Sequence, residues 1–89
     1  MNLKQMEYFV AIVNEGNISA AAKSLHISQP PLSAQMKLLE DELGVVLFER
    51  GSRSIFLTEA GKIFYEKALH ILHLTTAGSD ELQQMGQGF

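Results

Sequence analysis

Apolar residues recur along the first half of the chain at the spacing of amphipathic helices. The first set predicts a helix over residues 3–15, with Asn2 as a plausible cap and Gly16 and Asn17 as a plausible end. This spacing indicates one buried face and one solvated face. The apolar positions of the set are Leu3, Met6, Phe9, Val10 and Val13.

Two further helices follow, separated by three residues. The second is expected over residues 19–25, where three alanines favour a helix and keep its backbone thin for close packing. Its inward-facing residues are Ala21, Ala22 and Leu25. The third helix is predicted by a renewed apolar stripe and ends at Gly44. The stripe consists of Leu32, Met36, Leu39 and Leu43.

Two consecutive prolines stand at the front of the third helix. If Ser28 is the N-cap, then Gln29, Pro30 and Pro31 form the first turn, where backbone N–H groups have no acceptor within the helix. Proline therefore forfeits no hydrogen bond at this place and fixes φ in advance. The pair leaves a rigid apolar tip with few donors, which suits contact with a flat surface or with methyl groups.

The second half of the chain predicts a hairpin and a long helix. Residues 45–48 and 55–57 are β-rich and flank a polar turn that contains Gly51. Thr58 is expected to cap a final helix that Gly78 would interrupt or weaken. The expected fold class is mainly α: a winged helix-turn-helix of three helices and a two-stranded wing, followed by a long linker helix.

The short second and third helices form a predicted helix-turn-helix. A small residue, Ala22, permits a close crossing, which Ile27 in the turn and Leu32 on the third helix would fill. His26 occupies the turn position that usually carries glycine, and His tolerates left-handed backbone geometry better than most residues. The same pattern also suits an αα corner in any small helical protein.

One face of the third helix, opposite its apolar stripe, bears only small, polar or basic residues. Gln can pair with adenine, Ser can bond several base edges, and apolar groups can contact the thymine methyl. This face is therefore expected to enter a major groove, although a solvated helix face uses the same residue types. Its members are Gln29, Pro30, Ser33, Ala34 and Lys37.

The charge balance limits this hypothesis. The 89 residues carry a net charge of −3, which disfavours nonspecific binding to nucleic acid. A nucleic-acid-binding function must therefore depend on where the basic residues are placed. The only two arginines, Arg50 and Arg53, lie at the predicted hairpin tip. A wing can place such residues beside a neighbouring groove or phosphate.

Several other function classes find little support. The chain has no cysteine, hence no disulfide and no thiolate metal site, and His70 and His73 lack a third ligand, so neither metal nor cofactor is expected. No nucleophile–base pattern or phosphate loop indicates an enzyme. No apolar run reaches the roughly 18 residues of a membrane span, and no signal peptide is visible, so a cytoplasmic place and no membrane partner are expected. A protein-interaction module remains the rival class, which the acidic charge favours slightly.

Residues along most of the chain match the pattern of a known family in order and spacing: Leu3, Phe9, Ala21, Ala22, Leu25, Ser28, Gln29, Pro30, Ser33, Leu39, Glu40, Leu43, Gly44, Leu47, Phe48, Arg50, Leu57, Thr58, Ala60 and Gly61. With these residues the chain resembles the N-terminal DNA-binding domain of a LysR-type transcriptional regulator. The resemblance implies a winged helix-turn-helix over residues 1–58, a linker and dimerisation helix over 59–86, and a tail over 87–89. It also implies a larger effector-binding domain, the site of any small-molecule effector, that this piece or truncated form does not include.

The resemblance also implies a DNA-contacting set and a partner, double-stranded DNA with an interrupted palindrome. The third helix would read the major groove, and Arg53 would touch the minor groove or the backbone. The family often has Arg where this chain has Ala34, so one phosphate or guanine contact is expected to be missing. The expected set is Ser28, Gln29, Pro30, Pro31, Ser33, Ala34, Lys37, Arg50 and Arg53.

The last helix predicts a homodimer independently of the resemblance. Its apolar and small residues alternate at spacings of four and three, as in a coiled-coil seam. In the family, the linker helices pair antiparallel. The alternative is that a single long helix folds this stripe onto its own domain. The expected seam consists of Phe64, Ala68, Ile71, Thr75, Leu82 and Met85, with Gly78 also on the stripe.

Overall fold

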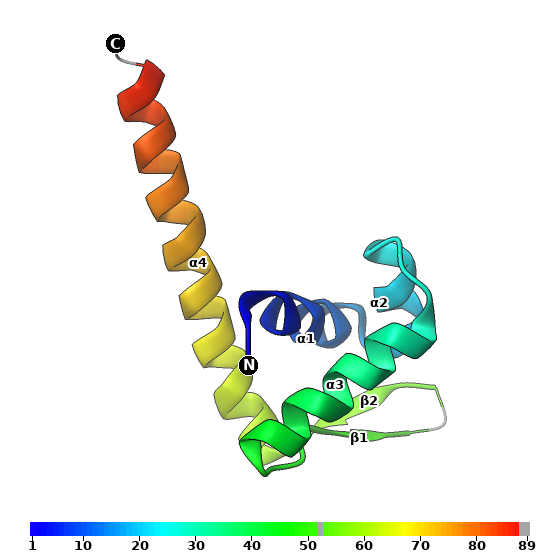
Figure 1. The fold of residues 1–89 in the computed structure, drawn as a ribbon. Helices are drawn as coiled ribbons and strands as arrows, with labels where there is room; N and C mark the ends of the chain where they lie inside the picture. The colour runs from blue at the N-terminus through cyan, green and yellow to red at the C-terminus, as the bar shows by residue number, and fades with distance from the viewer. Residues whose placement is uncertain (52, 88–89) are drawn as a thin grey trace.

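The structure is a computed structural model that describes residues 1–51 and 53–87, and the side chains of 1–49, 51 and 53–74. Its elements confirm the predicted winged helix-turn-helix and long final helix (Figure 1). In chain order they are α1 (Leu3–Glu15), α2 (Ile18–Ser24), α3 (Gln29–Leu43), β1 (Phe48–Arg50), β2 (Ile55–Leu57) and α4 (Glu59–Gln87).

One apolar core joins α1, α2, α3, the wing and the start of α4. Phe9 of α1 is fully buried at its centre, with its ring centroid 5.1 Å from that of Phe64 and 6.3 Å from that of Phe48. Burying each side chain of this size stabilises the fold by about 1.5–3 kcal/mol. The predicted α3 stripe contributes Leu32, Met36 and Leu39, all buried.

The helix-turn-helix has the predicted crossing. Ala22 and Leu32 are both buried, and the Ile27 N–H donates to the Ala22 carbonyl at 3.0 Å. His26 adopts φ 59°, the left-handed geometry that the sequence predicted for this turn. The turn therefore fixes where α3 begins relative to α2.

Asparagine side chains cap the first two helices. The Asn2 side-chain oxygen accepts from the Gln5 N–H at 2.8 Å, as expected. The Asn17 oxygen accepts from the Ala20 N–H at 2.7 Å, so α2 begins at Ile18 rather than at residue 19. Asn17 was expected to end the first helix; instead Gly16, at φ 82°, ends α1 and Asn17 begins the next helix.

The start of α3 lacks such a side-chain cap. Ser28 has N-cap backbone geometry, but its side chain makes no capping hydrogen bond. An N-cap hydroxyl normally accepts from the second or third N–H of the helix, and here those residues are Pro30 and Pro31, which have none. The exposed Ser28 hydroxyl is consequently not used by the helix itself.

The first strand begins three residues later than predicted, at Phe48 instead of residue 45. The backbone before it is engaged elsewhere: the Val45 N–H donates to the Glu40 carbonyl at 3.3 Å, and the Leu47 N–H donates to Glu40 Oε2 at 2.7 Å. The two strands pair antiparallel from Phe48–Leu57 to Arg50–Ile55. The Ile55 N–H also donates to the Gly16 carbonyl at 3.0 Å, which ties the wing to the end of α1.

The long helix α4 starts from the cap that the sequence predicted. Thr58 Oγ1 accepts from the Gly61 N–H at 3.0 Å and donates to the Val46 carbonyl at 2.6 Å. The helix packs against α1 and continues past Gly78 away from the rest of the domain (Figure 1).

The structure corrects the first part of the predicted dimer seam. Ala68 has no exposed surface within the single chain, and Phe64 packs against Phe9. These residues face α1 of their own chain because α4 lies against α1, so Ala68 offers no surface to a second copy. Phe64 is half-buried, and the next seam residue, Ile71, is exposed. Thr75, Leu82 and Met85 lie outside the residues whose side chains are described.

Gly61 permits the closest approach between α4 and the segment before the wing. A Cβ at this position would stand 1.9 Å from the Leu47 carbonyl oxygen and 3.0 Å from Leu57 Cδ2. The obstacle is backbone rather than the end of a flexible side chain. To avoid this clash, the start of α4 would have to move away from Leu47.

We expect Gly61→Ala to lower the free energy of unfolding by about 3 kcal/mol, because it overpacks this contact. Urea denaturation followed by circular dichroism measures the change. Lys62→Ala is the matched control: its side chain is exposed, and its ion pair with Glu59 contributes little, so the change should stay within about 0.5 kcal/mol. Equal stability of the two variants would contradict the close seating of α4 on Leu47.

A second prediction concerns the caps. Ser28→Ala should change the free energy of unfolding by less than about 0.5 kcal/mol, because no capping bond is lost. Asn17→Ala removes the α2 cap and should cost about 1 kcal/mol. The same denaturation experiment compares them, and a larger loss for Ser28→Ala would show that its hydroxyl supports the fold.

Candidate nucleic-acid interface

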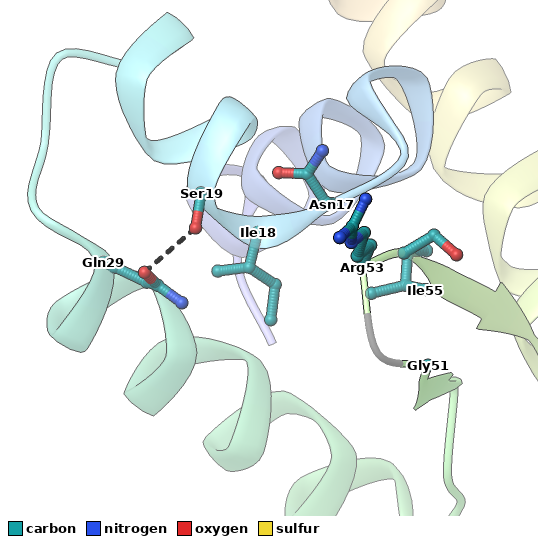
Figure 2. A pocket seen from close by; sticks show the side chains of 8 residues that line it. Asn17, Ile18, Ser19, Gln29, Gly51, Arg53 and Ile55 are labelled. Carbon is teal, nitrogen blue, oxygen red and sulfur yellow. Dashed lines mark hydrogen bonds between the residues drawn. The ribbon is translucent and has the colours of Figure 1, made fainter.

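Three segments that are distant in sequence meet at one edge of the molecule. The start of α3 and the tip of the wing point to the same end, away from the projecting part of α4 (Figure 1). Between them and the start of α2 lies a hollow of about 170 Å³ (Figure 2). It is lined by Asn17, Ile18, Ser19, Gln29, Gly51, Arg53, Ser54 and Ile55.

The predicted contact residues occupy the front of α3 and the wing. Ser33 is half-buried, whereas the other predicted residues of α3 and its cap are exposed. Gln29 and Arg53 are brought to one hollow, while Ala34 and Lys37 lie further along α3. The side chain of Arg50 lies outside the described part, although its backbone is in β1. The exposed residues are Ser28, Gln29, Pro30, Pro31, Ala34, Lys37 and Arg53.

The front of α3 is flanked by a second hollow on the side of α1. Its volume is about 260 Å³, and Pro31 and Ile27 form one wall. Lys4 lies on the other wall, with its ammonium nitrogen 5.8 Å from the centre of the Tyr8 ring. A basic residue therefore lines the hollow on each side of the helix front: Lys4 on one and Arg53 on the other.

Carboxylates are absent from the segments that form this edge. Residues 17–24, 28–37 and 50–54 contain no Asp or Glu and carry Lys23, Lys37 and both arginines. The chain's ten acidic residues all lie elsewhere, on α1, at the end of α3, on the wing strand and on α4. The amino-terminal end of α3 adds its positive helix dipole to the same edge. These segments thus carry no carboxylate, whereas on the α1 side of the second hollow Glu7 Oε2 lies 3.9 Å from the Lys4 ammonium.

One polar contact in the site was not predicted from the sequence. Ser19 Oγ donates to Gln29 Oε1 at 3.2 Å, which joins the start of α2 to the start of α3 (Figure 2). The sequence predicts Ser19 only as the start of the second helix. The two residues are ten positions apart, and no periodic pattern relates them, because the contact depends on how the two helices cross.

The described residues offer no alternative metal or membrane site. Among them, no three His, Cys, Asp or Glu side chains gather as they would to hold a metal ion. No helix in the described part of the chain is long and apolar enough to cross a bilayer.

Known proteins are similar to this chain in both sequence and fold. Residues 3–62 match the family model described as "Bacterial regulatory helix-turn-helix protein, lysR family". The HTH-type transcriptional regulator ClcR of Pseudomonas putida is 55% identical over 75 residues, which cover 84% of this chain and 26% of ClcR. The chain therefore spans about a quarter of the length of that relative.

Two solved structures of DNA complexes are similar to nearly the whole chain. The CbnR_DBD–DNA complex has 48% sequence identity and a TM-score of 0.89, covering 97% of this chain and 99% of that one. The BenM_DBD complex with catB site 1 DNA has 40% identity and a TM-score of 0.95, covering both chains completely. From its sequence and its fold, the chain belongs to the LysR family of bacterial regulatory helix-turn-helix proteins.

Proposed function

We propose that this chain binds double-stranded DNA sequence-specifically, as the N-terminal DNA-binding domain of a LysR-type transcriptional regulator. The observation that carries the proposal is the carboxylate-free edge built from the starts of α2 and α3 and from the wing tip. Folding brings basic and small polar residues together there on a chain that is acidic overall. The DNA complexes of CbnR_DBD and BenM_DBD, which have the same fold, support this function.

The front of α3 is the element proposed to enter the major groove. Gln29 and Ser33 supply hydrogen-bonding groups for base edges, while Pro30 and Ala34 supply apolar surface for thymine methyl groups. The two prolines have no backbone N–H that could donate to a base, so sequence specificity at this helix tip depends on side chains. Ala34 is too short to form the guanine or phosphate contact of a longer basic residue.

The hollows on either side of α3 are proposed to receive the two DNA strands. Lys4 on one side and Arg53 on the other are separate residues from separate elements, and each can neutralise a phosphate. Such contacts set the register of the helix in the groove without selecting a sequence. The Ser28 hydroxyl, which no capping bond uses, is a third candidate for a phosphate contact.

We also propose a homodimer, through an exposed face of α4 that shares Ile71 with the seam first expected but has Ile63, Lys67 and Leu74 in place of Phe64 and Ala68. Ile63 and Leu74 are 56% and 57% exposed, and Lys67 and Ile71 continue their face at helical spacing. An antiparallel pair along this face would place two α3 helices on an interrupted palindrome. Any small-molecule effector would act through a domain outside these 89 residues.

The ClcR relative is a transcriptional regulator, which supports a binding role rather than a catalytic one. A DNA-binding role would place the chain in the cytoplasm of a bacterium. Selection of bound sites from a random duplex pool, followed by titration of the selected and the scrambled duplex at physiological salt, tests the function. Equal, weak binding to both duplexes would instead favour the rival class, a protein-interaction module.

Gln29→Ala should weaken binding to the selected duplex by about 1–3 kcal/mol and flatten the preference at one base pair. The side chain is exposed and lies at the front of α3, so the fold should be unaffected. Fluorescence anisotropy titration of single-base variants of the duplex measures both effects. An equal loss on every sequence, the scrambled duplex included, would remove Gln29 from the base contacts.

Arg53→Ala should lower the slope of log affinity against log salt by about one unit, because one phosphate contact is lost. Titrations at several salt concentrations measure this slope. Lys62→Ala on α4 is the matched control, since its exposed cation lies outside both hollows and should leave the slope unchanged. The phosphate assignment fails if the Arg53 and Lys62 variants give the same slope as the unmodified chain.

Leu74→Glu should convert the dimer to a monomer in sedimentation velocity experiments, because it places a charge in the proposed α4 interface. Binding to the two half-sites of the palindrome should fall by at least about tenfold as the linkage between them is lost. Leu38→Glu is the matched control: Leu38 is 56% exposed but lies on α3. A dimer that survives Leu74→Glu but dissociates with Leu38→Glu would move the interface off α4.

A further inference from the structure

The hydrogen bond between Ser19 and Gln29 links a residue outside the predicted contact set to the front of α3. Ser19 Oγ donates to Gln29 Oε1 at 3.2 Å, and both side chains are exposed. In Figure 2 the amide nitrogen of Gln29 is turned away from the serine hydroxyl. The carbonyl end of the amide is therefore held, while its N–H donors remain available.

Ser19 is itself held by rigid neighbours. Its preceding residue, Ile18, is buried, and Asn17 caps α2 through the Ala20 N–H at 2.7 Å. The turn after α2 is fixed by the bond from the Ile27 N–H to the Ala22 carbonyl. The serine hydroxyl and the start of α3 thus have a defined relative position before any ligand binds.

A glutamine that contacts a base edge must give up side-chain rotamers, which lowers affinity. A partner that already holds the side chain in the free protein reduces this loss. It also selects which end of the amide reaches the base. In the major groove an N–H donor can bond the ring nitrogen N7, which adenine and guanine share, whereas adenine alone also offers the N6 donor to a free carbonyl.

We propose that Ser19 is a positioning residue for DNA recognition: it holds the Gln29 amide so that its N–H group is presented to a purine N7. The inference rests on the proposed function, because Gln29 must lie in the major groove. Ser19 makes no base contact of its own and acts through Gln29. The unmodified chain accordingly prefers a purine on the contacted strand at this position.

The test uses the full 89-residue chain and the duplex that it selects from a random pool. Ser19→Ala removes the hydroxyl, Ser19→Thr retains it, and Ser24→Ala is the matched control, an exposed serine at the other end of α2. Each substitution is made with Gln29 and with Gln29→Ala. A second duplex carries 7-deazapurine, in which carbon replaces N7, at the contacted base.

Ser19→Ala should weaken binding to the selected duplex by about threefold to tenfold, the effect of one hydrogen bond. Ser19→Thr and Ser24→Ala should bind within about twofold of the unmodified chain. With Gln29→Ala in place, or on the 7-deazapurine duplex, Ser19→Ala should cause no further loss. A structural role would not produce this dependence on Gln29 and N7.

Three results would overturn the proposal: no effect of Ser19→Ala, the same loss with Gln29→Ala in place, or the same loss on the scrambled duplex. The second and third would make Ser19 an independent backbone contact. Failure of the proposed function is distinct, because the unmodified chain itself would then fail to distinguish the selected duplex from the scrambled one.

Discussion

The backbone of Leu47 is the constraint on which the arrangement of the molecule depends. Its N–H donates to the Glu40 carboxylate, its carbonyl accepts from the Thr58 N–H at 3.1 Å, and Gly61 lies directly against that carbonyl. These contacts join the end of α3, the wing and the start of α4 at one buried residue. The segment before the wing and the start of α4 are both held at this junction. Glu40 has a structural role here because its side chain accepts a hydrogen bond from a backbone donor.

At the opposite end of α3, the two prolines change which groups are available to a ligand. They remove the N–H groups that would otherwise engage Ser28, and they leave the helix tip without these backbone donors. Recognition at this helix tip must therefore use side chains. The Gln29 side chain extends from the tip and is already hydrogen-bonded to Ser19. The rigid backbone and the held amide act in the same direction, because both limit the conformations that would be lost on binding.

An acidic chain can serve a nucleic-acid partner when its charges are separated in space. The acidic residues lie at the far end of α3, on α1, on β1 and on α4, whereas the carboxylate-free segments gather at one edge. The acidic chain as a whole would then attract DNA only weakly, while the carboxylate-free edge makes the local contact. This arrangement suits a domain that must distinguish one sequence among many.

The sequence by itself determined the elements and the family. Helical periodicity, the Gly44 end, the Thr58 cap and the left-handed turn at His26 follow from local physical chemistry, and the structure agrees with each. Four of the five residues predicted on the outer face of α3 are exposed, because a helix of known phase has a definite outer face, and the fifth, Ser33, is half-buried.

Only the tertiary structure decided which partner each face meets. Periodicity groups Phe64 and Ala68 on one stripe of α4 but does not say whether that stripe contacts a second chain or α1, and the packing of α4 selects α1. The late start of β1 depends on the Glu40 side chain, seven residues from Leu47. The bond between Ser19 and Gln29 depends on the crossing of two helices. Such contacts join residues that no local pattern relates, so only the folded chain reveals them.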